Sequence, residues 1–418
     1  MEDLIVVGAG LAGLAAGALA ATAGQRVLVL EAHAGNGRAA TTERNGFVFN
    51  GGPRALYRGG AAERVLATLG IHPTGGTPSA IGYGTRGGVM DLLPARTSSL
   101  IRTKLLGAAS KLQIAGLITR LPRVDASALS SMTMNQYIAA ANLRADAEAL
   151  VRMLLRVSTY CEQPDMLSAD AGVMMMQTGL GAGVRYLDDG WKQLTDALRA
   201  VIVGHGGEIR SHTAVRRAHS DRTAAEVELM DGTVLPALGV VLAVGGPQAT
   251  AALLESPPPS WSSLGPDATA ACLEVGLRAP SEKRIFFGLD EPLYYSVHCP
   301  PARLAPEGHA VAHALRYLGS SDPTPAEARA QLEAHVAAAG VAASDIVTSR
   351  YLHRMVASYA IPVAANGGLA GRPGSAIDGC PRIFVIGDWV GPDGMLADAV
   401  FASAERAVRA AMRVPAAS

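Results

Sequence analysis

Residues 4–31 read LIVVGAGLAGLAAGALAATAGQRVLVLE, and this stretch decides the fold. An apolar run, Leu4–Val7, predicts a strand, and three glycines follow it at the spacing GxGxxG. An alanine-rich segment then predicts a helix that ends at Gly24, before a second apolar strand over Val27–Leu30. Strand, glycine turn, helix and strand in this order predict a parallel βαβ unit.

The glycines of this unit have separate physical roles in binding a dinucleotide. Gly8 allows a tight turn, Gly10 lets the backbone approach a pyrophosphate, and Gly13 lets helix and strand pack closely. The free N–H groups and the dipole of the helix N-terminus favour phosphate binding. Glu31 ends the second strand, where a carboxylate accepts hydrogen bonds from an adenosine ribose. The stretch predicts FAD or NAD without distinguishing between them, and the carboxylate disfavours NADP.

Composition excludes several other classes of protein. A chain of 418 residues predicts two or three domains, and 36 basic against 36 acidic residues argue against a nucleic-acid partner. No apolar run is long enough to cross a bilayer, and the N-terminus lacks the features of a signal peptide. The four cysteines are widely spaced without a CxxC pair, which predicts reduced thiols, no metal site and a cytoplasmic protein.

Residues 92–124 carry six basic side chains and no acidic one, with Leu and Ile between them at roughly helical spacing. One interpretation is a pair of surface helices that covers a substrate domain. The other is a basic amphipathic face that rests on anionic lipid, which makes a peripheral membrane contact. The six residues are Arg96, Arg102, Lys104, Lys111, Arg120 and Arg123.

The middle of the chain predicts further elements. Helical spacing is found over 134–160, 193–203 and 325–339, and residues 270–298 are rich in strand formers. Asp231-Gly232 between two apolar runs predicts a hairpin with a type I′ turn.

A second strand–turn–helix pattern lies near the other end of the chain. Arg382–Ile386 predicts a strand, Gly387-Asp388 follows it, and Leu396–Met412 predicts a long helix. Asp388 is placed to accept a hydrogen bond from a sugar-like hydroxyl, and the alternative is an ordinary N-cap aspartate.

The two ends together resemble the FAD-binding superfamily that contains phytoene desaturases and flavin amine oxidases. The first glycines with Glu31 resemble its FAD fingerprint, and residues 35–39 resemble its glycine-glycine-arginine motif, with Asn36 in place of a glycine. Asn tolerates a left-handed backbone better than most residues. Gly51-Gly52-Pro53 resembles the segment that passes by the flavin. Residues 190–215 and 382–404 resemble its middle and C-terminal motifs.

The resemblance implies an α/β fold with a discontinuous Rossmann-like FAD-binding domain of the glutathione-reductase type and an inserted α+β substrate domain. The FAD-binding domain would comprise residues 1–75, 184–250 and 345–418. The substrate domain would comprise residues 76–183 and 251–344. Because Cys380 lies too close to the last strand to match a covalent attachment site, the FAD is expected to be non-covalent.

The resemblance also implies roles for individual residues. Glu31 would bind the ribose, Arg38 the pyrophosphate, and the backbone of Val215 the adenine. Asp388 would hold the ribityl or pyrophosphate region, and the N–H groups of Met395-Leu396 would face the pyrimidine edge of the flavin. The predicted cofactor-binding residues are Gly8, Gly10, Leu11, Ala12, Gly13, Glu31, Ala32, Arg38, Gly51, Gly52, Val215, Gly387, Asp388, Met395 and Leu396.

Three activities are compatible with this resemblance. The first is a phytoene-desaturase-like dehydrogenase or oxidase that moves a hydride from an apolar or lipid-like small molecule to flavin N5. The second is an amine or amino-acid oxidase, although the stretch that matches its lysine-bearing strand, residues 270–277, has no lysine, and aromatic residues are scarce. The third is a non-catalytic protein related to Rab-escort and GDP-dissociation-inhibitor proteins, which have no need of the FAD motifs. The electron acceptor is left open.

A hydride acceptor needs no protein nucleophile, so the catalytic residues leave little trace in the sequence. Arg54 and Tyr57 are the first candidates for handling a proton, because they follow the flavin-side glycines. The other candidates are Tyr294, Tyr295, His298 and His313.

Overall fold

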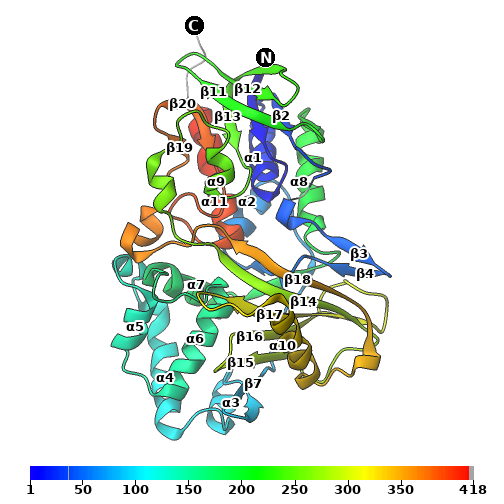
Figure 1. The fold of residues 1–418 in the computed structure, drawn as a ribbon, viewed down its shortest axis with the longest axis vertical. Coiled ribbons are helices and arrows are strands. Elements are labelled where there is room, and N and C mark those ends of the chain that lie inside the picture. Colours follow the sequence, from blue (N-terminus) through cyan, green and yellow to red (C-terminus); the bar gives the residue numbers. More distant parts are fainter. Residues whose placement is uncertain (36, 414–418) are drawn as a thin grey trace.

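Two β-sheets, one above the other in Figure 1, organise the chain. The computed structural model describes residues 1–35 and 37–413. The expected backbone at Asn36 therefore lies outside the described residues.

The upper sheet contains the N-terminal βαβ unit. It has the strand order β10-β2-β1-β13-β12-β11, and β20 pairs with β13 and with β19. β1 lies parallel to β2 and β13, and β13 lies parallel to β20. The strands are β1 (Glu2–Val7), β2 (Val27–Leu30), β10 (Glu208–Arg210), β11 (Val215–Ser220), β12 (Ala225–Leu229), β13 (Val234–Leu242), β19 (Ala376–Ile377) and β20 (Cys380–Val385).

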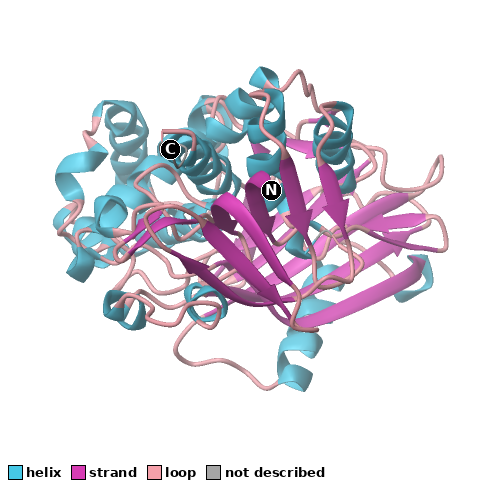
Figure 2. Cartoon of the chain, turned by 90° about the horizontal axis from the view of Figure 1, so that it is seen from above, coloured by secondary structure: helices cyan, strands magenta, loops and turns pink. Residues whose placement is uncertain are grey.

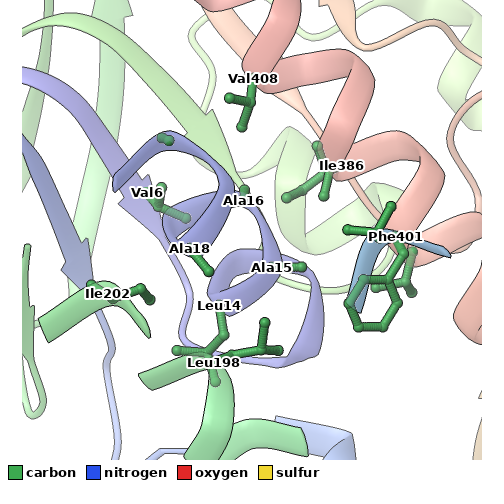
Figure 3. Close-up of a cluster of buried hydrophobic side chains, with 14 of the residues drawn as sticks. Val6, Leu14, Ala15, Ala16, Ala18, Leu198, Ile202, Ile386, Phe401 and Val408 are labelled. Atoms are coloured by element: carbon green, nitrogen blue, oxygen red, sulfur yellow. The ribbon is translucent and has the colours of Figure 1, made fainter. Parts of the chain in front are cut away.

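Three helices pack on this sheet: α1 (Leu11–Thr22), α8 (Lys192–Gly204) and α11 (Leu396–Ala411). A fourth, α2 (Ala61–Thr68), packs on α11. Figure 3 shows that the small side chains of α1, such as Ala16, lie between Ile202 of α8 and Phe401 and Val408 of α11. Because alanine and glycine dominate α1, its neighbours approach it closely on several sides. The nucleotide-binding elements thus share one core although they lie far apart in sequence.

The lower sheet has seven strands in the order β18-β14-β17-β16-β15-β7-β8. Its strands are β7 (Tyr83–Arg86), β8 (Val89–Leu92), β14 (Ala268–Leu277), β15 (Ile285–Gly288), β16 (Leu293–Cys299), β17 (Ala310–Leu318) and β18 (Ile346–Ser358). One helix, α10 (Pro325–Ala338), packs on β14, β16 and β17. β18 belongs to this sheet, whereas the predicted boundary at residue 345 assigns it to the FAD-binding segments.

Residues 97–181, between β8 and β9, are mainly helical, as the spacing predicts. It contains α3 (Thr97–Arg102), α4 (Ala108–Arg120), α5 (Met134–Ala140), α6 (Ala145–Thr159) and α7 (Ala169–Gly181). The short strands are β3 (Thr42–Arg44), β4 (Phe47–Phe49), β5 (Leu56–Tyr57), β6 (Gly75–Gly76) and β9 (Val184–Leu187), and one further short helix is α9 (Pro247–Ala251). Viewed from above, a large group of helices lies to one side of the strands (Figure 2). Among the described residues, no helix is both long and apolar enough to span a bilayer.

The predicted hairpin is present, but its turn differs from the prediction. Residues 230–233 join β12 to β13, and of these only Gly232 has a positive φ, of 87°. A type I′ turn needs a positive φ at two successive residues, so that prediction was wrong. The Asp231 carboxylate accepts the Thr233 N–H (2.9 Å), which stabilises the observed turn instead.

His335 of α10 is a buried histidine whose lowered pKa makes the stability of the fold depend on pH. Its ring stacks on Phe286, its Nε2 donates to the Phe286 carbonyl (3.2 Å), and burial lowers the pKa of the imidazole to about 4. An unfolded chain binds this proton near pH 6.5, so the native state loses stability as the pH falls from about 6.5 towards 4.

We predict that His335→Gln loses about 2 kcal/mol less stability than wild type between pH 7 and pH 5, because glutamine takes up no proton on unfolding. The measurement is the free energy of urea unfolding at the two pH values. His72→Gln, at an exposed histidine, is the control and should lose as much stability as wild type. An equal loss in His335→Gln and wild type would contradict the assignment.

Candidate active site

A single cavity of about 600 Å³ reaches from the glycine turn of the upper sheet to the tyrosines of the lower sheet. Gly8, Glu31 and Asp388 line one part of it, and Tyr294 and Tyr317 line another. The first group follows the carboxyl ends of parallel strands, which is where ligands bind in open α/β sheets. We call the two parts the nucleotide half and the substrate half.

The glycines of the nucleotide half show the close approaches that the sequence predicts. Gly8 has a φ of 104°, and a Cβ there would lie 2.6 Å from the Ala243 carbonyl oxygen. A Cβ on Gly13 would lie 1.8 Å from the Gly8 carbonyl oxygen, so this residue packs helix on strand and does not line the cavity. A Cβ on Gly10 would meet nothing within 4 Å, which leaves open space over the start of α1.

Glu31 faces the same half with its carboxylate held by the backbone. Oε2 accepts the Ala9 N–H (2.8 Å) and Oε1 accepts the His33 N–H (2.9 Å). Leu11, Ala12, Ala32 and Val215, which the sequence predicts for this site, also line the cavity, as does Gly387. These contacts fix the direction of the acid before any ligand binds.

Arg38 and Asp388 meet in the nucleotide half, although 350 positions separate them. Arg38 Nη2 lies 3.0 Å from Asp388 Oδ2, and its guanidinium lies over the Tyr359 ring, 4.4 Å from the centroid. The Asp388 side chain is buried, and its Oδ1 has no hydrogen-bond partner among the described residues. A buried acceptor without a partner is costly, so this oxygen fits a ligand hydroxyl.

The start of α11 contributes backbone groups to the cavity. Met395 is the N-cap residue, and no side chain caps the helix. Leu396 lines the cavity with a positive φ of 53°, which is uncommon for a leucine. Met395 itself packs in the helical core and does not line the cavity. Of this predicted pair, Leu396 is therefore the residue exposed to a ligand.

Gly51 and Gly52 lie behind the cavity wall, whereas the next residues, Pro53 and Arg54, line it. Arg54 Nε donates to the Asn50 carbonyl (3.0 Å), and no carboxylate of the described chain lies within ion-pair distance of its guanidinium. Burial lowers the pKa of Arg54. A desolvated cation with free N–H groups can bind an anion.

Tyr57 also lines the cavity, but its hydroxyl is engaged elsewhere. The hydroxyl donates to the Ser158 carbonyl of α6 (3.0 Å), and burial raises its pKa above the ordinary value of a phenol. This hydrogen bond favours a role in orienting the ring over a role in proton transfer.

The substrate half gathers aromatic side chains, contrary to the scarcity that the sequence indicates. Six of the ten tyrosines of the chain line the cavity. Tyr57, Tyr160, Tyr186, Tyr294 and Tyr317 lie in the substrate half, whereas Tyr359 lies beside Arg38 in the nucleotide half. Sequence reasoning missed most of them, because they come from separate elements and share no motif. Scarce aromatic residues are therefore no argument against an aromatic-lined site.

Of the other candidates for proton transfer, Tyr294 lines the cavity, and Tyr295, His298 and His313 lie behind its wall. Tyr294 faces the cavity, and the neighbouring Tyr295 points to the opposite face of β16, where its hydroxyl bonds Ser281 (2.8 Å). His298 and His313 are buried behind Tyr186 and do not line the cavity. Strand alternation explains the split between Tyr294 and Tyr295.

Trp191 belongs to the predicted middle motif, residues 190–215, but was not among the predicted cofactor-binding residues. It lines the cavity, and its buried Nε1 donor has no partner among the described residues. No lysine or cysteine of the described chain lines the cavity.

This geometry fits FAD on two observations. Open space lies over the N-terminus of α1, and unpartnered polar atoms of Asp388 and Trp191 lie at the cavity wall. When bound, FAD supplies a ring that accepts a hydride. The protein around it can hold the cofactor and orient a substrate.

Residues 3–261 match a family described as FAD dependent oxidoreductase. The match covers more than half of the chain, so the chain belongs to this family, and it is an enzyme that uses FAD. The FAD-dependent oxidoreductase predicted from the sequence is confirmed. A comparison with curated proteins finds no match.

Several solved structures share the fold over nearly the whole chain. An oxidoreductase from Methanosarcina mazei is 17% identical, with a TM-score of 0.76 over 98% of this chain and 99% of that one. Cyclohexylamine oxidase from Brevibacterium oxydans IH-35A is 17% identical, with a TM-score of 0.73 over 99% of both chains. A putative protoporphyrinogen oxidase from Exiguobacterium sp. 255-15 is 18% identical, with a TM-score of 0.71 over 97% of both. Identities this low establish the fold alone.

We predict that Asp388→Asn weakens FAD binding by about 10- to 100-fold, because Arg38 loses its ion-pair partner and the cavity loses a charged acceptor. The measurement is quenching of FAD fluorescence on titration with apoprotein. Asp393→Asn, at an aspartate that pairs with Arg406 near the surface, is the matched control and should leave the affinity unchanged. Equal affinities of Asp388→Asn and wild type would refute the role of Asp388.

Proposed function

We propose that the chain is a phytoene-desaturase-like dehydrogenase or oxidase that acts on an elongated, largely apolar small molecule carrying one anionic group. A hydride would pass from the substrate to flavin N5. The observation that carries this proposal is the substrate half of the cavity, where tyrosines and aliphatic side chains surround a single unpaired guanidinium, that of Arg54.

The cofactor would occupy the nucleotide half and end beside the substrate half. Glu31 would accept the ribose hydroxyls, Arg38 would bind the pyrophosphate, and the backbone of Val215 would bind the adenine. Asp388 would accept a hydroxyl of the ribityl chain. The uncapped N-terminus of α11 at Leu396 would face the negative edge of the reduced ring, since a helix dipole stabilises an anion there. We expect this binding to be non-covalent.

The lining of the substrate half favours an apolar body for the substrate. Leu154 and Val157 of α6, Leu180 of α7 and Ile285 and Phe287 of β15 lie among the tyrosines. Such walls bind mainly by burying apolar surface, and the few polar groups fix the orientation. Arg54 would then bind the one anionic group and set which end of the substrate approaches the flavin.

An amine or amino-acid oxidase is the second candidate, and the tyrosines favour it. Aromatic faces attract ammonium groups. Against a simple amine, the same half contains the cationic Arg54 and no lysine within the described chain. An amino acid would satisfy both features, because its carboxylate could bind the guanidinium.

A probe experiment separates an anionic from a cationic substrate. We predict that cinnamate perturbs the visible spectrum of the FAD-loaded enzyme, that phenethylamine does not, and that Arg54→Gln weakens cinnamate binding at least tenfold. Arg58→Gln, at a nearby exposed arginine, is the matched control and should bind cinnamate as wild type does. Binding of phenethylamine in place of cinnamate would transfer the proposal to an amine oxidase.

We further propose that the basic stretch makes a peripheral contact with anionic membranes. Of its apolar side chains, Leu112 is 77% and Ile101 68% exposed. None of its six cations forms an ion pair within the described chain. α3 and α4 lie at the end of the molecule away from the nucleotide-binding sheet (Figure 1). At the end of the stretch, the carbonyls of Leu121 and Val124 accept hydrogen bonds from Gln177 of α7. Gln177 lies one turn from the half-exposed cavity residue Leu180.

We predict that the enzyme sediments with vesicles of anionic phospholipid at low salt and is released at high salt. The variant Arg102→Gln/Lys104→Gln/Lys111→Gln should lose most of this binding. A control with three neutralised cations on the opposite side, Arg216→Gln/Arg217→Gln/Arg222→Gln, should retain it. Absence of lipid-dependent sedimentation at low salt would end the membrane proposal.

A further inference from the structure

A buried carboxylate, that of Glu274, lies in the middle of β14. Every residue of β14 is buried, and the Glu274 side chain is 0% exposed. This strand includes residues 270–277, the stretch that the family resemblance matches to a lysine-bearing strand of amine oxidases. Glu274 carries a negative charge there instead. A charge in such a strand is costly unless it is paired and hydrogen-bonded, so its partners indicate its role.

Glu274 has partners from the strands on both sides of β14. Its register partners are Arg350 in β18 and His313 in β17. Arg350 Nε donates to Oε2 (2.6 Å), and Nη2 lies 2.5 Å from the same oxygen. His313 Nδ1 lies 3.5 Å from Oε1. Burial lowers the pKa of His313 to about 4, so this imidazole is neutral and Arg350 is the cation that forms an ion pair with the carboxylate.

The second carboxylate oxygen reaches the segment that precedes Arg54. Oε1 accepts the N–H of Gly52 (2.9 Å), which lies 222 positions earlier in the chain. Arg350 also donates to Thr42 Oγ1 (3.0 Å), at the other end of the same segment. One ion pair therefore joins the lower sheet to residues 42–52.

The Gly52 backbone has a conformation that favours glycine. Gly52 has a φ of 115°, and a Cβ there would lie 2.5 Å from the sulfur of Met355 in β18. The next carbonyl, that of Pro53, accepts the hydroxyl of Tyr160. These two hydrogen bonds orient the Gly51–Gly52 and Pro53–Arg54 peptide units, and Arg54 lines the cavity directly after them.

We propose that Glu274 is a positioning residue that holds the Gly51–Arg54 segment against the flavin and sets the local charge there. Its carboxylate touches no cavity surface and acts through Gly52. The inference rests on FAD binding and not on the proposed substrate, so failure of the anionic-substrate proposal would leave it intact.

The test combines amide exchange with a reduction potential. In Glu274→Gln the Gly52 N–H keeps an acceptor without a charge, and Arg350 loses its counter-ion. We expect deuterium exchange in the peptide containing Gly52 to be at least tenfold faster, in the FAD-free and the FAD-loaded protein. We also expect the flavin potential, measured by dye equilibration, to become more positive, because removing a negative charge favours the reduced anionic ring.

The matched control is Glu282→Gln, at an exposed glutamate of the same domain, which should change neither quantity. Glu274→Asp keeps the charge but shortens the side chain, so it should accelerate exchange at Gly52 with a smaller change in potential. A folded Glu274→Gln protein with wild-type exchange and wild-type potential would overturn the proposal. So would an unprotected Gly52 amide in the wild-type protein, a result that needs no variant.

Discussion

The parallel pairing of β1 with β2 and β13, and of β13 with β20, is the constraint on which the rest of the structure depends. Parallel pairing aligns the carboxyl ends of these strands at one edge of the sheet. Gly8, Glu31 and Asp388 all follow strands at this edge, so segments from both ends of the chain meet there. The Arg38–Asp388 ion pair is the most direct product of that alignment.

The inserted segments convert this edge into an enclosed site. α6, α7 and the lower sheet supply the substrate half, and the Gly51–Arg54 segment lies at the junction of the two halves. Charges are distributed unevenly across that junction. Glu274 neutralises Arg350 behind the wall, whereas Arg54 within the cavity has no carboxylate partner in the described chain. This asymmetry is the physical basis for expecting an anion beside the flavin.

The local elements of the nucleotide half were predictable from sequence, because short-range periodicity and glycine spacing determine them. β1, α1 and β2 occur where the pattern of residues 4–31 places them, and Asp388 lies where a second strand–turn–helix pattern indicates. The long helices α6, α8 and α11 were predictable for the same reason. The type I′ turn was not, because the Asp231–Thr233 hydrogen bond favours another turn.

The substrate half could not be predicted, because its residues are brought together only by tertiary pairing. Tyr57, Tyr186 and Tyr317 belong to three different elements, and no local spacing relates them. The long strand β18 also escaped prediction. Its exposed and half-buried residues include Arg350 and Arg354, which hide the apolar alternation of a strand. A charged residue in a buried strand, such as Glu274, is visible in the sequence, but its partner is not.

The central claim is that the aligned strand ends hold one non-covalent FAD whose ring reaches the tyrosine-lined half. The most direct measurement is the visible absorption spectrum of the purified chain before and after acid precipitation. The account predicts an oxidised-flavin spectrum in the native protein, with about one FAD per chain released into the supernatant. A colourless protein that does not take up added FAD, or yellow colour that stays in the pellet, would contradict it.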